Sequence, residues 1–322
     1  MATKPFVIAP TLIAVAVSYA QANLIADKVL PRVPVDTESF RYLKHSIGDA
    51  FQSPDTRVGR KSAPNQIDWS ASEATASVTD QGLDSPVPNA DIEAYQRAIA
   101  AAGGNAALVS VEDPLMYTTR LIEQAVQNKR EARAAALVFN TSSYAASNQV
   151  TLSGTSQWSD YTNSDPLVQL MGYLDSMIVR ANVMTIGRQV ATKLRMHPKV
   201  CKAVYGNNTD AGIAPLQAIA DLLELEEIVV GDALINTAQP GQSPTMQRAW
   251  GKHCALTVRN KEANTKAGVT FGLTAQYGGK IAGTIDDSDI GLRGGVRVRN
   301  GESVVELITA NDLGYFVGNA VA

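Results

Sequence analysis

The chain has 322 residues, 45% of them hydrophobic, and a formal net charge of −3. It is long and apolar enough for about two domains with buried cores, and its slight negative charge argues against a protein that wraps nucleic acid through bulk positive charge. Its two cysteines, Cys201 and Cys254, lie far apart in the sequence, which excludes a disulfide framework and favours a reducing compartment.

The N-terminal residues allow two interpretations. Lys4, the apolar stretch Phe6–Ala20 and an Ala-Gln-Ala sequence at 20–22 are typical of a secretory signal with a cleavage site. Pro10 interrupts the apolar run, however, and the stretch is shorter than the roughly 20 residues that a membrane span needs. We therefore expect an uncleaved N-terminal arm over residues 1–36 and no membrane partner.

Residues 37–84 predict a projecting loop. Phe40 and Tyr42 indicate one strand, and Ile67–Val78 alternates loosely, like a strand that returns. The stretch between them, Gly48–Asn65, has no periodicity, and a loop this long without its own structure is either functional or disordered. Gly82–Pro88 follows and predicts a proline-rich joint.

A basic cluster lies in this loop, at Arg57, Arg60 and Lys61. In an enzyme it would clamp a phosphate, in an assembly it would contact an acidic neighbour, and in the simplest interpretation the loop is merely solvated. A projecting basic tip on an acidic chain favours a contact in trans. These three residues are the candidate inter-subunit site.

The stretch Ser110–Phe139 predicts a long amphipathic helix, with Ser110 as its cap and Pro114 in its first turn. A narrow apolar stripe follows the helical period, and it consists of Leu115, Thr118, Ile122, Ala125, Val126 and Leu137. The charged flanks of this helix are expected to face outward. The helix is either a strut or an ordinary surface helix, and a shorter helix is expected before it, within 89–105.

Helices and strands alternate from Asp165 onward. Helices are expected at 165–178, 188–196 and 215–225, and buried strands at 183–186 and 228–230, which is typical of a compact α/β unit. Beyond Trp250 the pattern is mostly β, and Asn300-Gly301 between two alternating stretches predicts a tight hairpin turn.

A search for catalytic motifs is negative. The sequence contains no GxSxG, HExxH or Walker A motif, and only three histidines, so we expect no catalytic residue, no metal site and no cofactor. His253 and Cys254 are adjacent, which favours a packed thiol and a surface imidazole over a nucleophile–base pair. The acidic run Asp286, Asp287 and Asp289 predicts a solvated turn rather than a calcium loop.

Several segments, in order along nearly the whole chain, resemble the major capsid proteins of tailed double-stranded DNA bacteriophages. They are LIADKVLPRVPV, SPDTRVGRKSAPN, GLDSPVP, NQVTLSGTSQWSDY, TIGRQVATKLRMHPKV, DLLELEEIVVGDA, RAWGKH, TFGLTAQYG, IGLRGGVRVRNGESV and DLGYFV. No single motif carries the resemblance.

The resemblance implies the α+β Hong Kong 97-like capsid fold. Its parts would be the N-terminal arm at 1–36, an extended β-hairpin loop at 37–84, a peripheral domain at 85–164 with a spine helix at 110–139, an α/β axial domain at 165–260, and strands at 261–322 that return to the peripheral domain.

The resemblance also implies a function. The chain would be a structural subunit of an icosahedral capsid, assembled in the bacterial host cytoplasm as hexamers and pentamers around double-stranded DNA, which it contacts weakly and non-specifically. Scaffold, portal and decoration proteins would be further partners. Two alternatives remain open: a secreted enzyme that uses the N-terminal stretch as its signal, and a protein-storing shell of the same fold.

Overall fold

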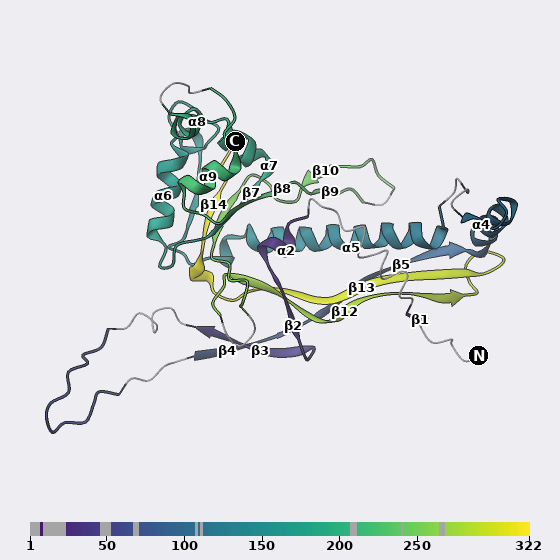
Figure 1. Cartoon of the computed structure of the whole chain (residues 1–322), viewed down its shortest axis with the longest axis horizontal. Helices are drawn as coiled ribbons and strands as arrows, with labels where there is room; N and C mark the ends of the chain where they lie inside the picture. Colours follow the sequence, from purple (N-terminus) through teal and green to yellow (C-terminus); the bar gives the residue numbers. More distant parts are fainter. Residues whose placement is uncertain are drawn as a thin grey trace.

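The computed structural model describes residues 7–8, 24–45, 53–66, 71–106, 109, 112–206, 211–239, 241–263 and 268–322. The molecule is elongated, with a long sheet and a long helix along its axis, a separate α/β unit near one end and a hairpin loop that projects beyond that end (Figure 1). Residues 1–6 and 9–23, together most of the expected N-terminal arm, lie outside the described residues.

The long sheet has the strand order β1-β12-β13-β5, and β2 also pairs with β12. β12 (Gly272–Asp287) and β13 (Gly295–Ile308) are antiparallel, and β5 (Thr79–Pro88) runs antiparallel to β13 along its other edge. Two short strands pair with the outer edge of β12: β1 (Val7–Ile8) antiparallel and β2 (Arg32–Val35) parallel.

The expected hairpin turn at Asn300-Gly301 is wrong, because β13 runs straight through both residues and pairs there with β5 and β12. The turn between β12 and β13 lies at 288–294 instead. The glycine serves close packing: a Cβ at Gly301 would lie 2.7 Å from the carbonyl oxygen of Gln81 on β5. The buried Asn300 amide donates to Glu123 Oε2 at 2.8 Å, so the pair marks a crowded strand rather than a turn.

The expected joint at Gly82–Pro88 is also wrong, since these residues belong to β5. β5 is an edge strand of the long sheet, and an edge tolerates prolines because the missing N–H can fall on the solvent side. The proline-rich composition is therefore that of an edge strand of the sheet.

The second sheet has the order β6-β14-β11-β7-β8. Its strands are β6 (Gln149–Thr151), β14 (Gly314–Gly318), β11 (Cys254–Thr257), β7 (Val183–Gly187) and β8 (Glu227–Gly231). The outer pairs β6–β14 and β7–β8 are parallel, and β11 is antiparallel to both of its neighbours. The last strand therefore belongs to this α/β sheet and does not return to the long sheet, in contrast to the expectation for 261–322.

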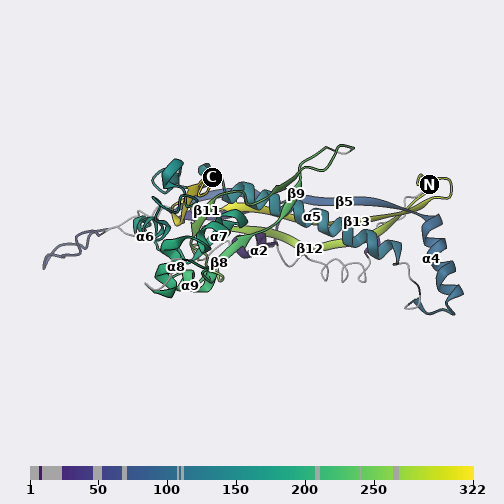
Figure 2. The same cartoon turned by 90° about the horizontal axis from the view of Figure 1, so that it is seen from above.

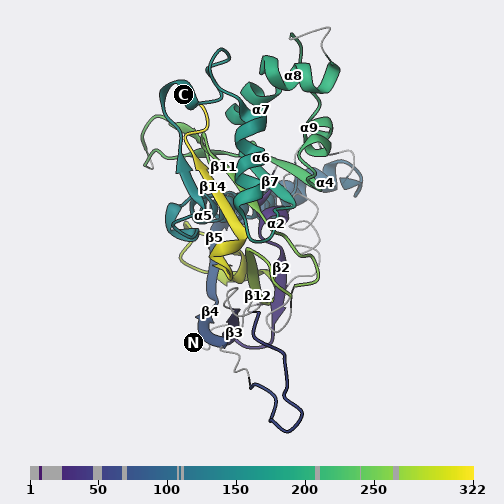
Figure 3. The ribbon, with the colours of Figure 1, turned by 90° about the vertical axis from the view of Figure 1, so that its left-hand side faces the viewer.

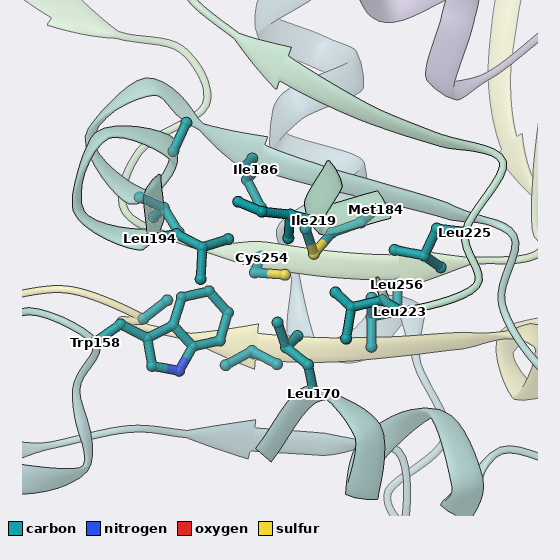
Figure 4. Packing of buried hydrophobic residues seen from close by; sticks show 14 of the residues in the cluster. Trp158, Leu170, Met184, Ile186, Leu194, Ile219, Leu223, Leu225, Cys254 and Leu256 are labelled. Atoms are coloured by element: carbon teal, nitrogen blue, oxygen red, sulfur yellow. The ribbon is translucent and has the colours of Figure 1, made fainter. Parts of the chain in front are cut away.

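Four helices surround the second sheet: α6 (Pro166–Ser176), α7 (Arg188–Arg195), α8 (Pro198–Tyr205) and α9 (Leu216–Leu222). They confirm the three predicted helices, and α8 begins at the predicted restart after His197. Their buried side chains pack with those of the strands in one cluster, in which Trp158, Leu170, Met184, Ile219 and Leu256 are at most 1% exposed (Figure 4).

The predicted long helix is present as α5 (Pro114–Val138), which follows the shorter α4 (Asn89–Ala101). The cap residue is Asp113, whose carboxylate accepts the backbone N–H of Leu115 at 2.9 Å; the expected cap, Ser110, lies outside the described residues. α5 lies along the long sheet (Figures 1 and 2), and its 25 residues span about 37 Å at about 1.5 Å per residue. The predicted long helix is therefore confirmed close to its expected bounds; its role as a strut stays a prediction.

The remaining elements are short. They are the helix α2 (Ala26–Val29), the hairpin strands β3 (Ser39–His45) and β4 (Ala71–Ser77), the hairpin strands β9 (Leu234–Asn236) and β10 (Met246–Arg248), and 3₁₀ turns at Thr141–Ser143, Gly154–Ser156 and Asn311–Leu313.

Candidate functional site

The face of α5 that lies on the long sheet is charged as well as apolar. Its buried residues are Thr119, Ile122, Glu123, Val126, Gln127, Arg130, Glu131, Ala134, Ala135 and Val138. The expectation that the charged flanks of this helix face outward is therefore wrong for three residues, Glu123, Arg130 and Glu131, each 1% exposed. Ile122 and Val126 are buried as predicted, whereas Ala125 is exposed.

The helical period of the sequence indicates that one of these charged residues, Arg130, is buried. Ile122, Val126, Arg130, Ala134 and Val138 recur every four residues, so Arg130 occupies the buried row. Sequence reasoning missed it because a charge is assigned to solvent unless a buried partner is known.

Glu123 connects α5 to β12 and β13. Its carboxylate forms an ion pair with Lys280, accepts the Gln127 amide at 2.9 Å, and accepts the Asn300 amide at 2.8 Å. A buried carboxylate is tolerated only when its lone pairs are satisfied in this way. The contact fixes the position of the helix along the strands.

A second cluster joins α5 to the arm segment. Arg130 Nη2 lies 2.6 Å from Asp27 Oδ1 and donates to Thr274 Oγ1 at 3.3 Å. Arg32 donates from Nε to Asp27 Oδ1 at 2.8 Å and from Nη1 to Glu302 Oε2 at 2.6 Å. Burial raises the pKa of Asp27, but the guanidinium groups of Arg130 and Arg32 outweigh it and hold the pKa below its ordinary value. The Asp27 carboxylate therefore stabilises the fold at pH values above its pKa in the unfolded chain. This stabilisation is lost as the pH falls through the pKa of Asp27 in the folded protein.

Glu131 holds three segments together. Its Oε1 accepts the backbone N–H of Ile25 at 2.9 Å and the indole N–H of Trp250 at 2.6 Å, and its Oε2 accepts the N–H of Ala26 at 2.9 Å. Trp250 is fully buried and lies next to the α/β unit, just before β11. One carboxylate thus joins the base of the arm, the long helix and the α/β unit.

The three predicted site residues, Arg57, Arg60 and Lys61, lie in the exposed segment 53–66. This segment belongs to the projecting loop between β3 and β4 (Figures 1 and 3). Within the segment the contacts are local: Arg57 N–H donates to Asp55 Oδ1 at 3.0 Å, and a turn is closed from Ser62 N to Gly59 O at 3.0 Å. The three cations have no ion pair among the described residues.

The base of the hairpin, in contrast, is packed. Phe40 of β3 lies in a cluster with Val33, Val35, Leu273 and Ala275 on the outer face of the long sheet. The hairpin is therefore anchored at its base, while its tip extends away from the rest of the molecule.

Within the described part of the chain no group of three histidines, cysteines or carboxylates is arranged to hold a metal ion. Cys254 is fully buried, and burial raises the pKa of its thiol well above the ordinary value, so the thiol is not activated. His253 lies against the rings of Phe139 and Phe316, and its Nδ1 accepts the N–H of Asn319 at 3.1 Å. The packed-thiol interpretation is confirmed; the imidazole is half-buried rather than on the surface.

None of the described helices has the length and apolarity that a membrane crossing requires.

No protein-family model matches the sequence. The chain is 48% identical over 322 residues to the major capsid protein of Pseudomonas phage JBD67, and the match covers 100% of both chains. The crystal structure of a phage-related protein from Bordetella bronchiseptica RB50 superposes with a TM-score of 0.73 at 22% identity and covers 98% of this chain and 99% of that one. The putative capsid protein of a prophage from E. coli CFT073 gives a TM-score of 0.55 at 13% identity, with 98% and 99% covered.

Proposed function

Since the chain belongs to the major capsid proteins of bacteriophages and has the Hong Kong 97-type fold, we propose that its copies assemble as hexamers and pentamers into an icosahedral shell around double-stranded DNA. Membership of this family implies a structural role in the virion capsid. The full-length similarity to the major capsid protein of phage JBD67 carries this proposal.

The assembly mechanism that we propose relies on the parts of the chain that extend beyond the packed cores. The loop segment 53–66 is exposed along its whole length, and such a segment can bury its surface only against another molecule. Many modest interfaces of this kind add up through multivalency. We further propose assembly in the host cytoplasm, weak non-specific contact with the packaged DNA, and scaffold, portal and decoration proteins as partners.

The domain division is a further part of this proposal. The proposed arm stays at 1–36. The proposed loop, expected at 37–84, ends before Thr79, because β5 belongs to the long sheet, and the proposed peripheral domain with α5, expected at 85–164, gains β5 and loses β6. The axial domain at 165–260 is extended by β6 and β14, because both strands pair within its sheet.

The chain expressed alone and imaged by negative-stain electron microscopy tests this function. We expect closed particles, and we expect nuclease-resistant DNA inside particles isolated from infected cells. A chain that stays monomeric at high concentration would contradict the assembly proposal, and particles filled with protein and free of DNA would favour the protein-storing shell.

Reversing the charges of Arg57, Arg60 and Lys61 together to glutamate is expected to lower the particle yield by about tenfold or more, since like charges across an interface cost several kcal/mol. The subunit should stay folded, because these side chains lie outside every packed cluster. Particle yield by sedimentation and the unfolding transition by circular dichroism measure the two effects.

The matched control exchanges Arg57 and Arg60 for lysine and Lys61 for arginine, which preserves the charge at each position. This control should assemble like the unmodified chain. A normal particle yield from the charge-reversed variant would show that the loop tip is merely solvated.

A further inference from the structure

The α/β unit has a basic patch on one side. Arg188, Lys193, Arg248 and Lys252 line a pocket of about 450 Å³ beside Ala322. Arg248 forms an ion pair with Asp232, and Lys193 lies 5.7 Å from the ring centroid of Tyr161. Arg188 and Lys252 have no ion pair among the described residues. We call these four cations the basic face.

An acidic and apolar patch lies elsewhere on the same unit. Its carboxylates are Asp175, Asp221, Glu224 and Glu226, which we call the acidic face. Glu226 is paired with Lys261 and Arg259, so the other three carboxylates carry most of its charge. The carboxylates of Asp175 and Glu224 are 68% and 71% exposed, and both contact Arg180. Three exposed apolar side chains lie in this region: Ile178 (56%), Val179 (37%) and Leu222 (40%).

The sheet register separates the two faces. Arg188 directly follows β7. Lys252 lies just before β11, whose first residue, Cys254, pairs with Ile186 near the C-terminal end of β7. These two residues of the basic face therefore lie at the C-terminal end of β7. Glu226 precedes β8, whose first residue pairs with Val183 at the opposite end of β7. A five-residue strand spans about 15 Å, so the two faces cannot meet within one copy.

The two faces therefore lie beyond opposite ends of the β7–β8 strand pair. A cationic surface and an anionic surface on opposite sides of one subunit form a head-to-tail pair, and repeating one such contact by a rotation closes a ring.

We infer that the basic face of one copy docks on the acidic face of the next, so that this polar contact closes the rings of subunits. The inference rests on the proposed capsid function and adds to it the two surfaces that meet. Ile178, Val179 and Leu222 supply the apolar contact area, and the charges around them fix the orientation and reject back-to-back pairs.

Three variants test this inference. The first carries Arg188→Glu, Lys193→Glu and Lys252→Glu, and presents two acidic faces. The second carries Asp175→Lys, Asp221→Lys and Glu224→Lys, and presents two basic faces. The third combines all six changes and exchanges the signs of the two faces. Circular dichroism of each variant shows whether it is folded, and electron microscopy and sedimentation measure assembly beside the unmodified chain.

Each single-face variant alone is expected to lose at least about tenfold in particle yield while it stays folded. The variant with all six substitutions should form particles again, because its two faces are once more of opposite charge. In an equimolar mixture, the two single-face variants should alternate around each ring. Strict alternation needs an even number of subunits, so six-membered rings can form and five-membered rings cannot. The mixture should therefore form tubes or flat sheets without closed shells.

Normal assembly of both single-face variants would overturn the inference. A variant with all six substitutions that is folded but does not assemble would also overturn it. This outcome would show that the single-face variants fail for a reason other than the loss of opposite charges on the two faces. Failure of the unmodified chain to form any ring or particle would instead count against the proposed function.

Discussion

Replacing Gly187 with alanine is expected to lower the free energy of unfolding by about 4 kcal/mol or more, at the upper end of single-residue effects. A Cβ at this position would lie 2.0 Å from the carbonyl oxygen of Gly251 and 2.4 Å from that of Trp250. Both obstacles are backbone atoms, so no side-chain rotation relieves the overlap. Denaturant unfolding followed by circular dichroism measures the loss, and the soluble fraction after expression records it if the variant does not fold.

The backbone conformation of Gly187 is ordinary, with φ of −68°, so the requirement is for space and not for conformational freedom. Its register partner Gly231 is constrained by the same neighbour, because a Cβ there would lie 2.1 Å from Cγ of Trp250. Gly187 and Gly231 thus form the surface against which residues 250–251 pack.

Gly172→Ala is the matched control. Gly172 lies in α6, and no atom comes within 4 Å of the position of an added Cβ. Alanine there should raise the free energy of unfolding by about 0.5–1 kcal/mol, since glycine is the poorer helix former. Equal stabilities for the two variants would show that the 250–251 segment does not pack on β7 as described.

Replacing Glu131 with glutamine is expected to lower the free energy of unfolding by about 3 kcal/mol. The substitution preserves shape but places an amide NH₂ against donors, because both carboxylate oxygens accept N–H groups from Ile25, Ala26 or Trp250. The base of the arm should also open more often, so the amides of Ile25 and Ala26 should exchange with deuterium faster than in the unmodified chain.

The same substitution at Glu112, whose side chain is 45% exposed and paired with Arg120, is the control and should change stability by under about 0.5 kcal/mol. A cycle with Trp250→Phe measures the indole contact: the two changes should be less than additive, since Glu131→Gln weakens the hydrogen bond that Trp250→Phe removes. Additivity would mean that Glu131 and Trp250 act independently.

The sequence predicted those elements whose signal is local. The helices α6, α7 and α9 each carry an apolar face, α6 also has Asp165 as its cap, and the buried strand β7 is a short apolar run. Each of these elements lies within a few residues of its predicted position. The exposed position of the basic loop tip also follows from local composition. Its contact with another copy stays a prediction.

The sequence did not predict features that depend on distant partners. A buried charge such as Arg130 is acceptable only because Asp27 and Thr274 come within reach from segments more than a hundred positions away. Likewise, β5 and the continuous β13 oppose their local turn signals because each has a long strand to pair with. Long-range pairing overrides turn chemistry wherever the pairing buries more backbone.

The position of β14 in the second sheet has a consequence for the order of synthesis. β14 lies between β6 and β11, so a ribosome makes both of its neighbours long before the strand that joins them. Until residues 314–318 emerge, β6 has no partner in this sheet and one edge of β11 is open. Domains fold as units during synthesis, and this one can close only after residues 314–318 have been made. A growing chain that lacks them does not present a finished subunit to its neighbours.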